Sequence, residues 1–485
     1  MGRRFESCRK RKVFKFIIRK IWLNLYFQLL KQSRLKINYF VFQAEPNKGI
    51  IKMEHIGLFK KLTINLSDNL FWGGIFLLPS APFFSIILFI YPIFLGIRIN
   101  TKNILKDKAN LLLVTVATSM IIKSLITSLV LKEELNNWDQ SLNWIGLGNY
   151  IPLFLFYLGF QPYLNSDLKR EKLGKFLLLG TIPVIFSCFS QYFLKWYGPY
   201  EFLNGLIIWF QRPLTEVNQP VSGLFNNPNY TGAWLAMIWP YSLALQSHFK
   251  NNKKSFSYFL IFCLCISIIF TLNLINSRGA WLGVLLSIPI MYGKNILVWF
   301  IPFVIFLSLY LIICIVPNVP LNLQSYLRSL IPQNILTNFE DINISLDNWP
   351  RLLIWKNALL LIFEKPFFGW GAASFPLIYL SQTGLWKAHP HNLFLELSVS
   401  YGLIPSLLLV VFITIILKDT YKYVYNSHYQ FNKFNRACWA SVLIFLTLQM
   451  FDIVYFDFRI SIIFWVLLAG LRNIFYEKKI SQSIK

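Results

Sequence analysis

Two histidines stand together in the stretch HPHNLFLE (389–396), where a long polar segment gives way to an apolar one. They are His389 and His391, and the chain of 485 residues has only five histidines. An imidazole with a pKa near 6.5 can accept and return a proton at neutral pH. A histidine at the start of a helix can also be a simple boundary residue, and this alternative stays open for both.

Two arginines also stand at apolar boundaries. Arg278 lies in NSRGAW, a short turn between two apolar runs, and Arg351 opens the amphipathic run RLLIWKNALLLIFEK. A guanidinium fork matches phosphate oxygens, so two arginines and a histidine on one face favour a site for a phosphorylated, membrane-anchored substrate. The simpler alternatives are interfacial snorkelling for Arg278 and plain solvation for Arg351.

The composition indicates a membrane protein. Apolar residues make up 55% of the chain and charged residues only 14%, whereas about a quarter of a soluble domain is charged. The apolar residues lie in long runs such as 295–316, which are long enough to cross a membrane as helices. The predicted fold class is an all-α polytopic membrane protein. Its six cysteines lie mostly in or beside apolar runs and predict no disulfide framework.

The basic charge is distributed as a topology signal. A net charge of +26 would suggest nucleic acid as the partner of a soluble chain. Here residues 98–108 carry four Lys/Arg and belong with the basic N-terminus on the cytoplasmic side. The run 70–97 must then turn back at Pro79 or Pro82, as two short or tilted helices. This predicts about twelve transmembrane helices, both termini in the cytoplasm, and no nucleic-acid partner.

The same pattern gives the domain organisation. Residues 1–69 are a basic segment with a surface-lying amphipathic helix, and Met53 is a second possible start, which leaves open whether residues 1–52 belong to the working protein. Residues 70–316 hold nine helices, 317–390 a helical periplasmic cap, 391–475 three helices and 476–485 a cytoplasmic tail. The predicted single spans are 109–131, 150–164, 176–194, 229–247, 255–275, 280–293, 295–316, 391–417, 437–455 and 460–475. The loops placed outside are 132–149, 195–228, 276–279, 317–390 and 456–459, which hold ten of the 47 Lys/Arg.

Four stretches resemble one family when read in order. His391-Asn392, nine residues, then Gly402-Leu-Ile-Pro405 resembles the His-Asn…Gly-x-x-Gly motif of the O-antigen ligase and polymerase family, with Pro405 replacing the last glycine. RLLIW (351–355) is similar to its loop arginine motif, with Trp355 replacing leucine. SRGAWLG (277–283) and GLFNNPNYTGAWLA (223–236) resemble two further family stretches. The region from about 220 to 415 is also similar to the related cyanobacterial membrane proteins once proposed to accumulate inorganic carbon.

The resemblance implies a GT-C-like helical transferase in the bacterial inner membrane. It would move a glycan from undecaprenyl diphosphate to an acceptor hydroxyl on the periplasmic face, without a metal or cofactor. The acceptor would be lipid A-core, or another glycan or protein. Arg278 and Arg351 would grip the diphosphate and His391 would orient or deprotonate the acceptor hydroxyl. The expected substrate-binding residues are Asn392, Asn227, Asn229, Arg212 and His389.

Other readings of these residues stay open. NNPN (226–229) is most simply a turn and a helix N-cap. Glu396 could join His389 and His391 around a metal ion, although this spacing is a poor zinc signature. The chain has no Gly-rich phosphate loop and no Asp-x-Asp, which argues against Mg²⁺-bound nucleotide-sugar donors.

Three alternative functions also remain. A polysaccharide polymerase of the same superfamily is the closest. A bicarbonate or small-anion transporter would need buried midplane charge, for which Lys123 and Asp452 are the candidates. A scaffold role is the third.

Overall fold

The structure is a computed structural model that describes residues 48–104, 106–130, 139, 141–216, 219–251, 255–315, 321–329, 350–425 and 433–483. Residues 66–485 form one compact unit and residues 1–65 another. Of the second unit only the beginning of helix α2 is described. The amphipathic helix expected near the N-terminus lies outside the described residues, as does much of the cap between residues 330 and 349.

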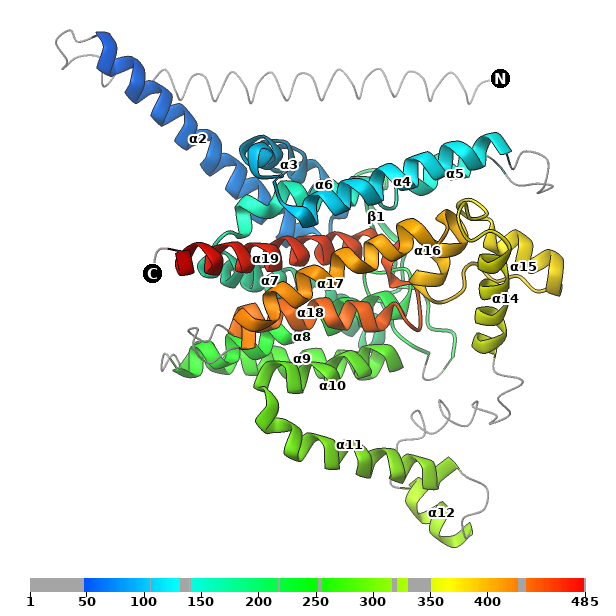
Figure 1. Ribbon diagram of the computed structural model, residues 1–485. Coiled ribbons are helices and arrows are strands. Elements are labelled where there is room, and N and C mark those ends of the chain that lie inside the picture. Colours follow the sequence, from blue (N-terminus) through cyan, green and yellow to red (C-terminus); the bar gives the residue numbers. More distant parts are fainter. Residues whose placement is uncertain are drawn as a thin grey trace, which may run out of the picture. The chain divides into compact units, whose positions relative to one another are not determined.

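The described part is almost entirely helical (Figure 1). Its one described sheet pairs two short antiparallel strands, which lie in the predicted loop 195–228. The elements, in chain order, are α2 (Lys48–Leu77), α3 (Pro82–Ile104), α4 (Lys108–Val130), α5 (Ser141–Leu147), α6 (Ile151–Phe160), η3 (Gln161–Leu164), α7 (Asp167–Phe193), β1 (Tyr200–Phe202), β2 (Ile207–Trp209), α8 (Pro228–Asn251), α9 (Ser255–Ile275), α10 (Arg278–Tyr292), α11 (Lys294–Ile315), α12 (Leu321–Ser329), α14 (Pro350–Glu364), α15 (Phe375–Thr383), α16 (Leu393–Tyr401), α17 (Leu403–Tyr425), α18 (Lys433–Leu448), η5 (Val454–Phe456) and α19 (Phe458–Ser483).

Six of the described helices are long and apolar enough to cross a membrane. They are Pro82–Thr101, Lys108–Leu129, Asp167–Phe193, Ser255–Ile275, Leu403–Tyr425 and Phe458–Glu477. Two shorter apolar helices, Arg278–Tyr292 and Asn295–Tyr310, fall below that length. The predicted class of all-α membrane protein is therefore confirmed, and the count of twelve spans stays a prediction.

The ambiguous run 70–97 does turn back on itself. The chain reverses at residues 78–81, between α2 and α3. The Ser85 hydroxyl donates to the Gly74 carbonyl over 2.7 Å, and the rings of Phe71 and Phe89 lie 6.2 Å apart. The two helices therefore pack against each other on either side of the turn, as the charge pattern predicted. However, α3 is not short, because it continues to Ile104 through most of the segment expected to be a loop.

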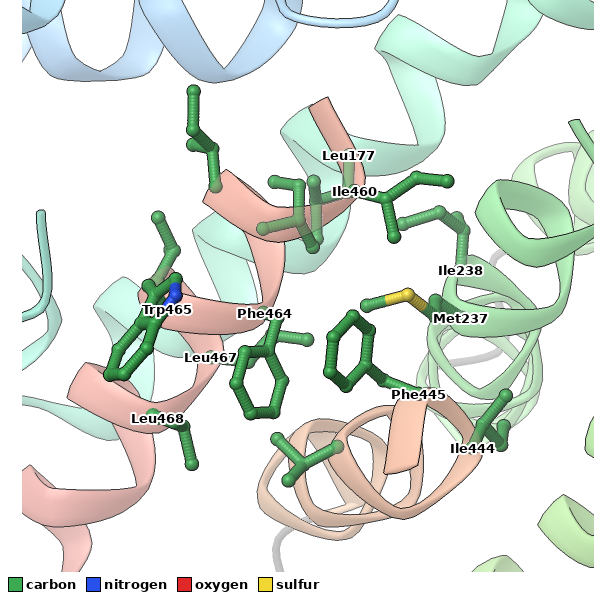
Figure 2. Close-up of a cluster of buried hydrophobic side chains, with 14 of the residues drawn as sticks. Leu177, Met237, Ile238, Ile444, Phe445, Ile460, Phe464, Trp465, Leu467 and Leu468 are labelled. Carbon is green, nitrogen blue, oxygen red and sulfur yellow. The ribbon is translucent and has the colours of Figure 1, made fainter. Parts of the chain in front are cut away.

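The core of the larger unit surrounds α19. In the apolar window of this helix 89% of the residues are buried. Phe464 of α19 stacks on Phe445 of α18 with ring centroids 3.9 Å apart, and Trp465 packs edge-on against Phe154 of α6. Figure 2 shows side chains of α7, α8, α18 and α19 meeting in this cluster. Burial of so many large side chains makes α19 the axis around which the other helices are placed.

The span predicted at 391–417 is broken. It forms two helices, α16 and α17, separated at Gly402 with φ +82°. A Cβ at Gly402 would lie 2.6 Å from the Phe367 carbonyl oxygen, so only glycine fits this close approach. Pro405 lies in the first turn of α17, where a helix needs no donor from it. The bend is therefore at Gly402, and Pro405 is compatible with it.

The described part of the cap folds against α16. Side chains of α14, α15 and α16 share a second apolar cluster that includes Ile354, Phe375 and Val399. The backbone of the cap also fills the break in the helix, because Trp370 N–H donates to Val399 O over 2.7 Å and Leu403 N–H donates to Pro366 O over 2.8 Å. The break thus leaves these backbone groups paired, as the interior of a membrane protein requires.

Candidate functional site

His391 is held at the start of α16 by an unusual backbone conformation and a carboxylate. Its φ is +54°, in the left-handed region that non-glycine residues rarely adopt. Its Nδ1 lies 3.1 Å from Oδ1 of Asp452, in the connection between α18 and η5. An ionised carboxylate can only accept, so Nδ1 of His391 carries the proton and Nε2 keeps its lone pair. This is the tautomer that a general base needs on the side facing a substrate.

Asp452 lies shortly after the end of α18 and not inside that helix. The sequence placed it inside a helix at 437–455, but α18 ends at Leu448. Besides His391, its carboxylate accepts from Ile453 N–H over 2.9 Å and from Asn229 Nδ2 over 3.0 Å. Burial acts to raise the pKa of Asp452, but the hydrogen bond and charge of His391 outweigh it and lower the pKa below its ordinary value.

His389 packs beside His391 as a neutral partner. The two ring centroids lie 4.5 Å apart, and Nδ1 of His389 accepts from the backbone N–H of His391 over 3.2 Å. Burial, and then repulsion from the His391 ring whenever that ring is protonated, lowers the pKa of His389 to about 4. His389 is therefore uncharged at neutral pH and acts on the His391 backbone, which helps to hold its left-handed conformation.

Asn229 links the two ends of the site. Its amide nitrogen donates to Asp452, and its Oδ1 accepts from the Ser277 hydroxyl over 3.1 Å. Ser277 is buried and directly precedes Arg278, the first residue of α10. A continuous chain of hydrogen bonds therefore runs from His391 through Asp452 and Asn229 to the turn that carries Arg278. Asn227 lies just before α8 and its Oδ1 accepts from Asn229 N–H over 2.8 Å, which is the N-cap that the sequence suggested.

The other predicted site residues are less closely joined to this chain of bonds. Arg278 is exposed at the start of α10, and Arg351 is exposed in the first turn of α14, a helix that packs on α16. Among the described contacts none joins Arg351 to His391, so their convergence stays a prediction. Arg212 is an exposed residue after β2 whose carbonyl accepts from Gln191 Nε2 over 2.7 Å.

Asn392 has a positioning task. It is the N-cap of α16, and its Oδ1 accepts from the N–H groups of Phe394 and Leu395. Its Nδ2 donates to the Met450 carbonyl over 3.3 Å, which ties the helix start to the loop that carries Asp452. These bonds all go to the protein's own backbone, and the substrate contact expected of Asn392 stays a prediction.

One group of side chains could hold a metal ion. His389, His391 and Asp452 each offer a ligand atom, and these atoms lie within 4.8 Å of one another. Glu396, the third ligand suggested by the sequence, is buried and its Oε1 accepts from the Ser400 hydroxyl instead. The His391–Asp452 bond gives the same residues a second use, because it sets the tautomer of His391 for proton transfer.

An apolar groove leads along the helices to the Arg278 turn. Its volume is about 570 Å³, and its lining comes from α8, α9 and α10. Asn273 and Trp281 line the end beside residues 277–278, while Leu243 and Phe262 line the other. From residue 262 to residue 273 the groove follows α9 for about 17 Å. Its shape and apolar walls suit an extended hydrocarbon chain.

Comparison with known proteins gives one family. Residues 261–413 match the model of the O-antigen ligase family. These residues, about a third of the chain, are similar to that family. The match contains Arg278, Arg351 and His391, and it confirms the resemblance over that range. It does not extend to the stretch 223–236 or to Asp452.

Two relatives are similar to longer parts of the chain. Over 330 residues the chain is 25% identical to an uncharacterised protein of Haemophilus influenzae, an alignment that covers 59% of this chain and 80% of that protein. Over 191 residues it is 29% identical to the ComP-specific O-oligosaccharyltransferase of Acinetobacter baylyi, which covers 37% of this chain and 32% of that enzyme. The second relative and the family match together support a membrane glycosyltransferase of the O-antigen ligase type.

Sequence reasoning missed several residues around His391. Asp452 was considered only as a midplane charge, and Ser277 was not singled out. Asp457 and Arg459 form a buried ion pair after η5, with the guanidinium 3.7 Å from the Phe225 ring centroid. This pair could have been found from the sequence FDFR (456–459), which is one of the loops predicted to lie outside the membrane. An acidic and a basic residue two apart there indicate a pair that must be kept out of the lipid.

The two charges considered for a transporter lie elsewhere. Lys123 of α4 sits 4.1 Å from the ring centroid of Phe368, a residue of the cap, and Asp452 belongs to the His391 site. Both candidates are thus next to the cap and its site. The small-anion transporter stays an alternative prediction.

Proposed function

We propose that the protein transfers a glycan from undecaprenyl diphosphate to an acceptor hydroxyl at the outer face of the bacterial inner membrane. The observation that carries this proposal is the chain of hydrogen bonds from His391 to the Arg278 turn. It joins a base of defined tautomer to a turn that bears an arginine at the end of an apolar groove. A base, an anion-binding cation and a lipid groove are the three parts that such a transfer needs.

The reaction follows from the roles of these groups. The acceptor oxygen attacks the anomeric carbon, the bond from that carbon to the diphosphate oxygen breaks, and its electron pair leaves with the diphosphate. Nε2 of His391 takes the hydroxyl proton, and Asp452 stabilises the imidazolium that forms. Arg278 and Arg351 bind the charge that accumulates on the leaving diphosphate. No metal is required for any of these steps.

The groove between α8, α9 and α10 would hold the lipid tail of the donor. Its end beside Asn273 and Trp281 adjoins the Arg278 turn, which would set the diphosphate at the arginine when the chain lies in the groove. Binding energy from the remote tail then positions the reacting carbon. A donor with a truncated lipid should accordingly lose rate as well as affinity.

The test is the variant His391→Ala in membranes that contain the donor. We expect transfer to fall about 10²–10⁴-fold, with accumulation of the undecaprenyl diphosphate-linked glycan and normal amounts of folded protein. The matched control is His248→Ala, at the end of α8. If transfer continues unchanged in His391→Ala, the proposal is wrong.

The product separates ligase from polymerase. Glycan joined to lipid A-core or to a protein indicates ligation, whereas longer lipid-linked chains indicate polymerisation. Both reactions use the same site and the same chemistry. The comparison with an O-oligosaccharyltransferase favours ligation to an acceptor other than a second lipid-linked glycan.

A further inference from the structure

A second cavity lies at the end of the helices that is far from His391. Helices α10 and α18 each have one end at the His391 site, because α10 begins next to Ser277 and α18 ends shortly before Asp452, while α17 continues from α16, which begins beside His391. Helix α18 packs against both α10 and α17 and lies between them in Figure 1. The cavity, of about 570 Å³, is lined by residues at their opposite ends. The length of α10 alone separates the two sites by about 20 Å.

The walls of this cavity suit the boundary between lipid and water. Tyr425 and Trp439 lie on one side, with ring centroids 5.4 Å apart. The Tyr425 hydroxyl donates to the Ile290 carbonyl over 2.9 Å. Ile290 and Leu297 add an apolar surface. Tyrosine and tryptophan at the ends of apolar helices are typical of the membrane interface.

Cations surround the same cavity. Arg436 is buried, and it lines this cavity together with Lys422 and a neighbouring cavity of about 200 Å³ together with Lys433. Its Nη1 donates to the Met291 carbonyl over 3.1 Å, and its guanidinium carbon lies 4.7 Å from the Tyr425 ring centroid. These contacts fix the guanidinium at the junction of the two cavities.

Like charges gather around Lys433, and an anion bound there would be attracted by all of them. The positive charges of Lys250 and Arg436 act on Lys433 by electrostatic repulsion. Lys433 is also the first residue of α18, where the backbone N–H groups and the helix dipole favour a negative group. Two independent features, clustered cations and a helix N-terminus, thus favour an anion in the same place.

We propose that the cavity binds an anionic phospholipid. Its phosphate would lie between Arg436, Lys433 and Lys422, and an acyl chain would lie against Ile290 and Leu297. Basic pockets between membrane helices are known to bind anionic head groups. This site is separate from the transfer site and does not depend on the proposed function.

The test compares two lipids that differ in charge. The full-length protein, purified in detergent and freed of lipid, is titrated with phosphatidylglycerol and with phosphatidylcholine of identical acyl chains. Bound lipid is counted by native mass spectrometry, and the unfolding midpoint is followed by heating. We expect saturable binding and a raised midpoint with phosphatidylglycerol only, weakened by salt.

Variants locate the binding. The double variant Lys422→Gln with Lys433→Gln should lose about fivefold in affinity for each cation removed. The matched control, Lys356→Gln with Lys387→Gln in the cap, should bind as the unchanged protein does. Leu297→Trp fills the apolar side without touching a charge and should also weaken binding. Equal binding of both lipids, or unchanged phosphatidylglycerol affinity in the double variant and in Leu297→Trp, would overturn the proposal.

Discussion

At the scale of single residues, Asp452 accepts three hydrogen bonds, and this explains why it stays ionised although it is partly buried. The donors are Nδ1 of His391, the Ile453 N–H and Nδ2 of Asn229. A carboxylate with three donors is stabilised in its charged form. An ionised Asp452 in turn makes His391 present its unprotonated nitrogen on the opposite side of the ring.

Replacement of Asp452 tests this dependence. We expect Asp452→Asn to lower the transfer rate about 10²-fold or more, because an amide can stabilise the wrong tautomer of His391 and cannot stabilise the imidazolium. The rate is measured with a saturating donor, together with its pH profile, which should change shape. Asp139→Asn, in an exposed loop, is the control. A wild-type rate in Asp452→Asn would remove this carboxylate from the mechanism.

The lowered pKa of His389 predicts a loss of stability in acid. Its folded pKa is about 4, and its unfolded pKa is about 6.5. Between these values the unfolded chain binds more protons, so stability falls as the pH is lowered. Between pH 7 and pH 5 this group lowers the free energy of unfolding by about 2 kcal/mol. The thermal unfolding midpoint of the wild type should therefore fall more steeply from pH 7 to pH 5 than the midpoint of His389→Gln.

The comparison with His389→Gln isolates one group. His391 and Asp452 face His389 and are present in both proteins, so the comparison isolates the change at His389. Parallel curves for the two proteins from pH 7 to pH 5 would contradict a depressed pKa at His389.

At the scale of elements, the break at Gly402 can be tested with a matched pair of glycines. Gly402 has φ +82° and Gly384, at the end of α15, has φ +70°. A Cβ at Gly402 would meet the Phe367 carbonyl, whereas nothing lies within 4 Å of a Cβ at Gly384. Both Gly→Ala changes cost about 1 kcal/mol in backbone strain.

The crowding at Gly402 adds to this strain. We expect Gly402→Ala to lower the unfolding midpoint clearly more than Gly384→Ala and to reduce transfer, because it displaces α16 and with it His391. Thermal unfolding and a transfer assay on both variants provide the measurement. Equal effects of the two changes would show that the close approach at the break contributes nothing.

The sequence predicted some elements well and others poorly, for physical reasons. The hairpin at Pro79–Pro82 followed from charge, because Lys and Arg on both sides of 70–97 require a return. The break at Gly402 could not be read in the same way, since an apolar run looks alike whether it is straight or bent. What fixes the bend is the backbone of residues 366–371, which is distant from Gly402 in the sequence and reaches it only in the folded chain.

The candidate site shows the same division. His391 and Arg278 could be singled out because histidine is rare in this chain and arginine is unusual in a turn between apolar runs. The hydrogen-bonding roles of Asp452 and Asn229 could not be predicted, although both residues were named as candidates for other tasks, because their partners lie tens to more than two hundred residues away. A single sequence gives residue types and local spacing, and the tertiary contacts between α8, α16 and the end of α18 supply the rest.

At the scale of the whole molecule, buried ion pairs tie together the helices at the end remote from His391. Arg472 of α19 donates to Asp107, before α4, and to Asp419 of α17, each over 2.8 Å. A guanidinium shared by two carboxylates satisfies all three charges inside the protein. The long helices are thus joined by polar contacts at one end and by the apolar core in the middle.

Orientation in the membrane is the prediction that belongs to this scale. Because the segments placed outside hold few Lys/Arg, the cap is expected in the periplasm and residues 476–485 in the cytoplasm. A cysteine at Gln382, exposed at the end of α15, should react with a membrane-impermeant maleimide in intact cells. A cysteine at Ser483 should react only after lysis. The reverse pattern would invert the topology and place His391 inside the cell.

The backbone that crosses the break at Gly402 has a consequence for how substrates arrive. Trp370, Gly371 and Leu403 all donate across this junction, and lifting the cap would strip those amides of their partners in a place where water is scarce. We therefore expect the part of the cap that carries these donors to stay in place during turnover. A lipid-linked donor would then enter sideways from the bilayer, and the acceptor would reach the imidazole around the rim.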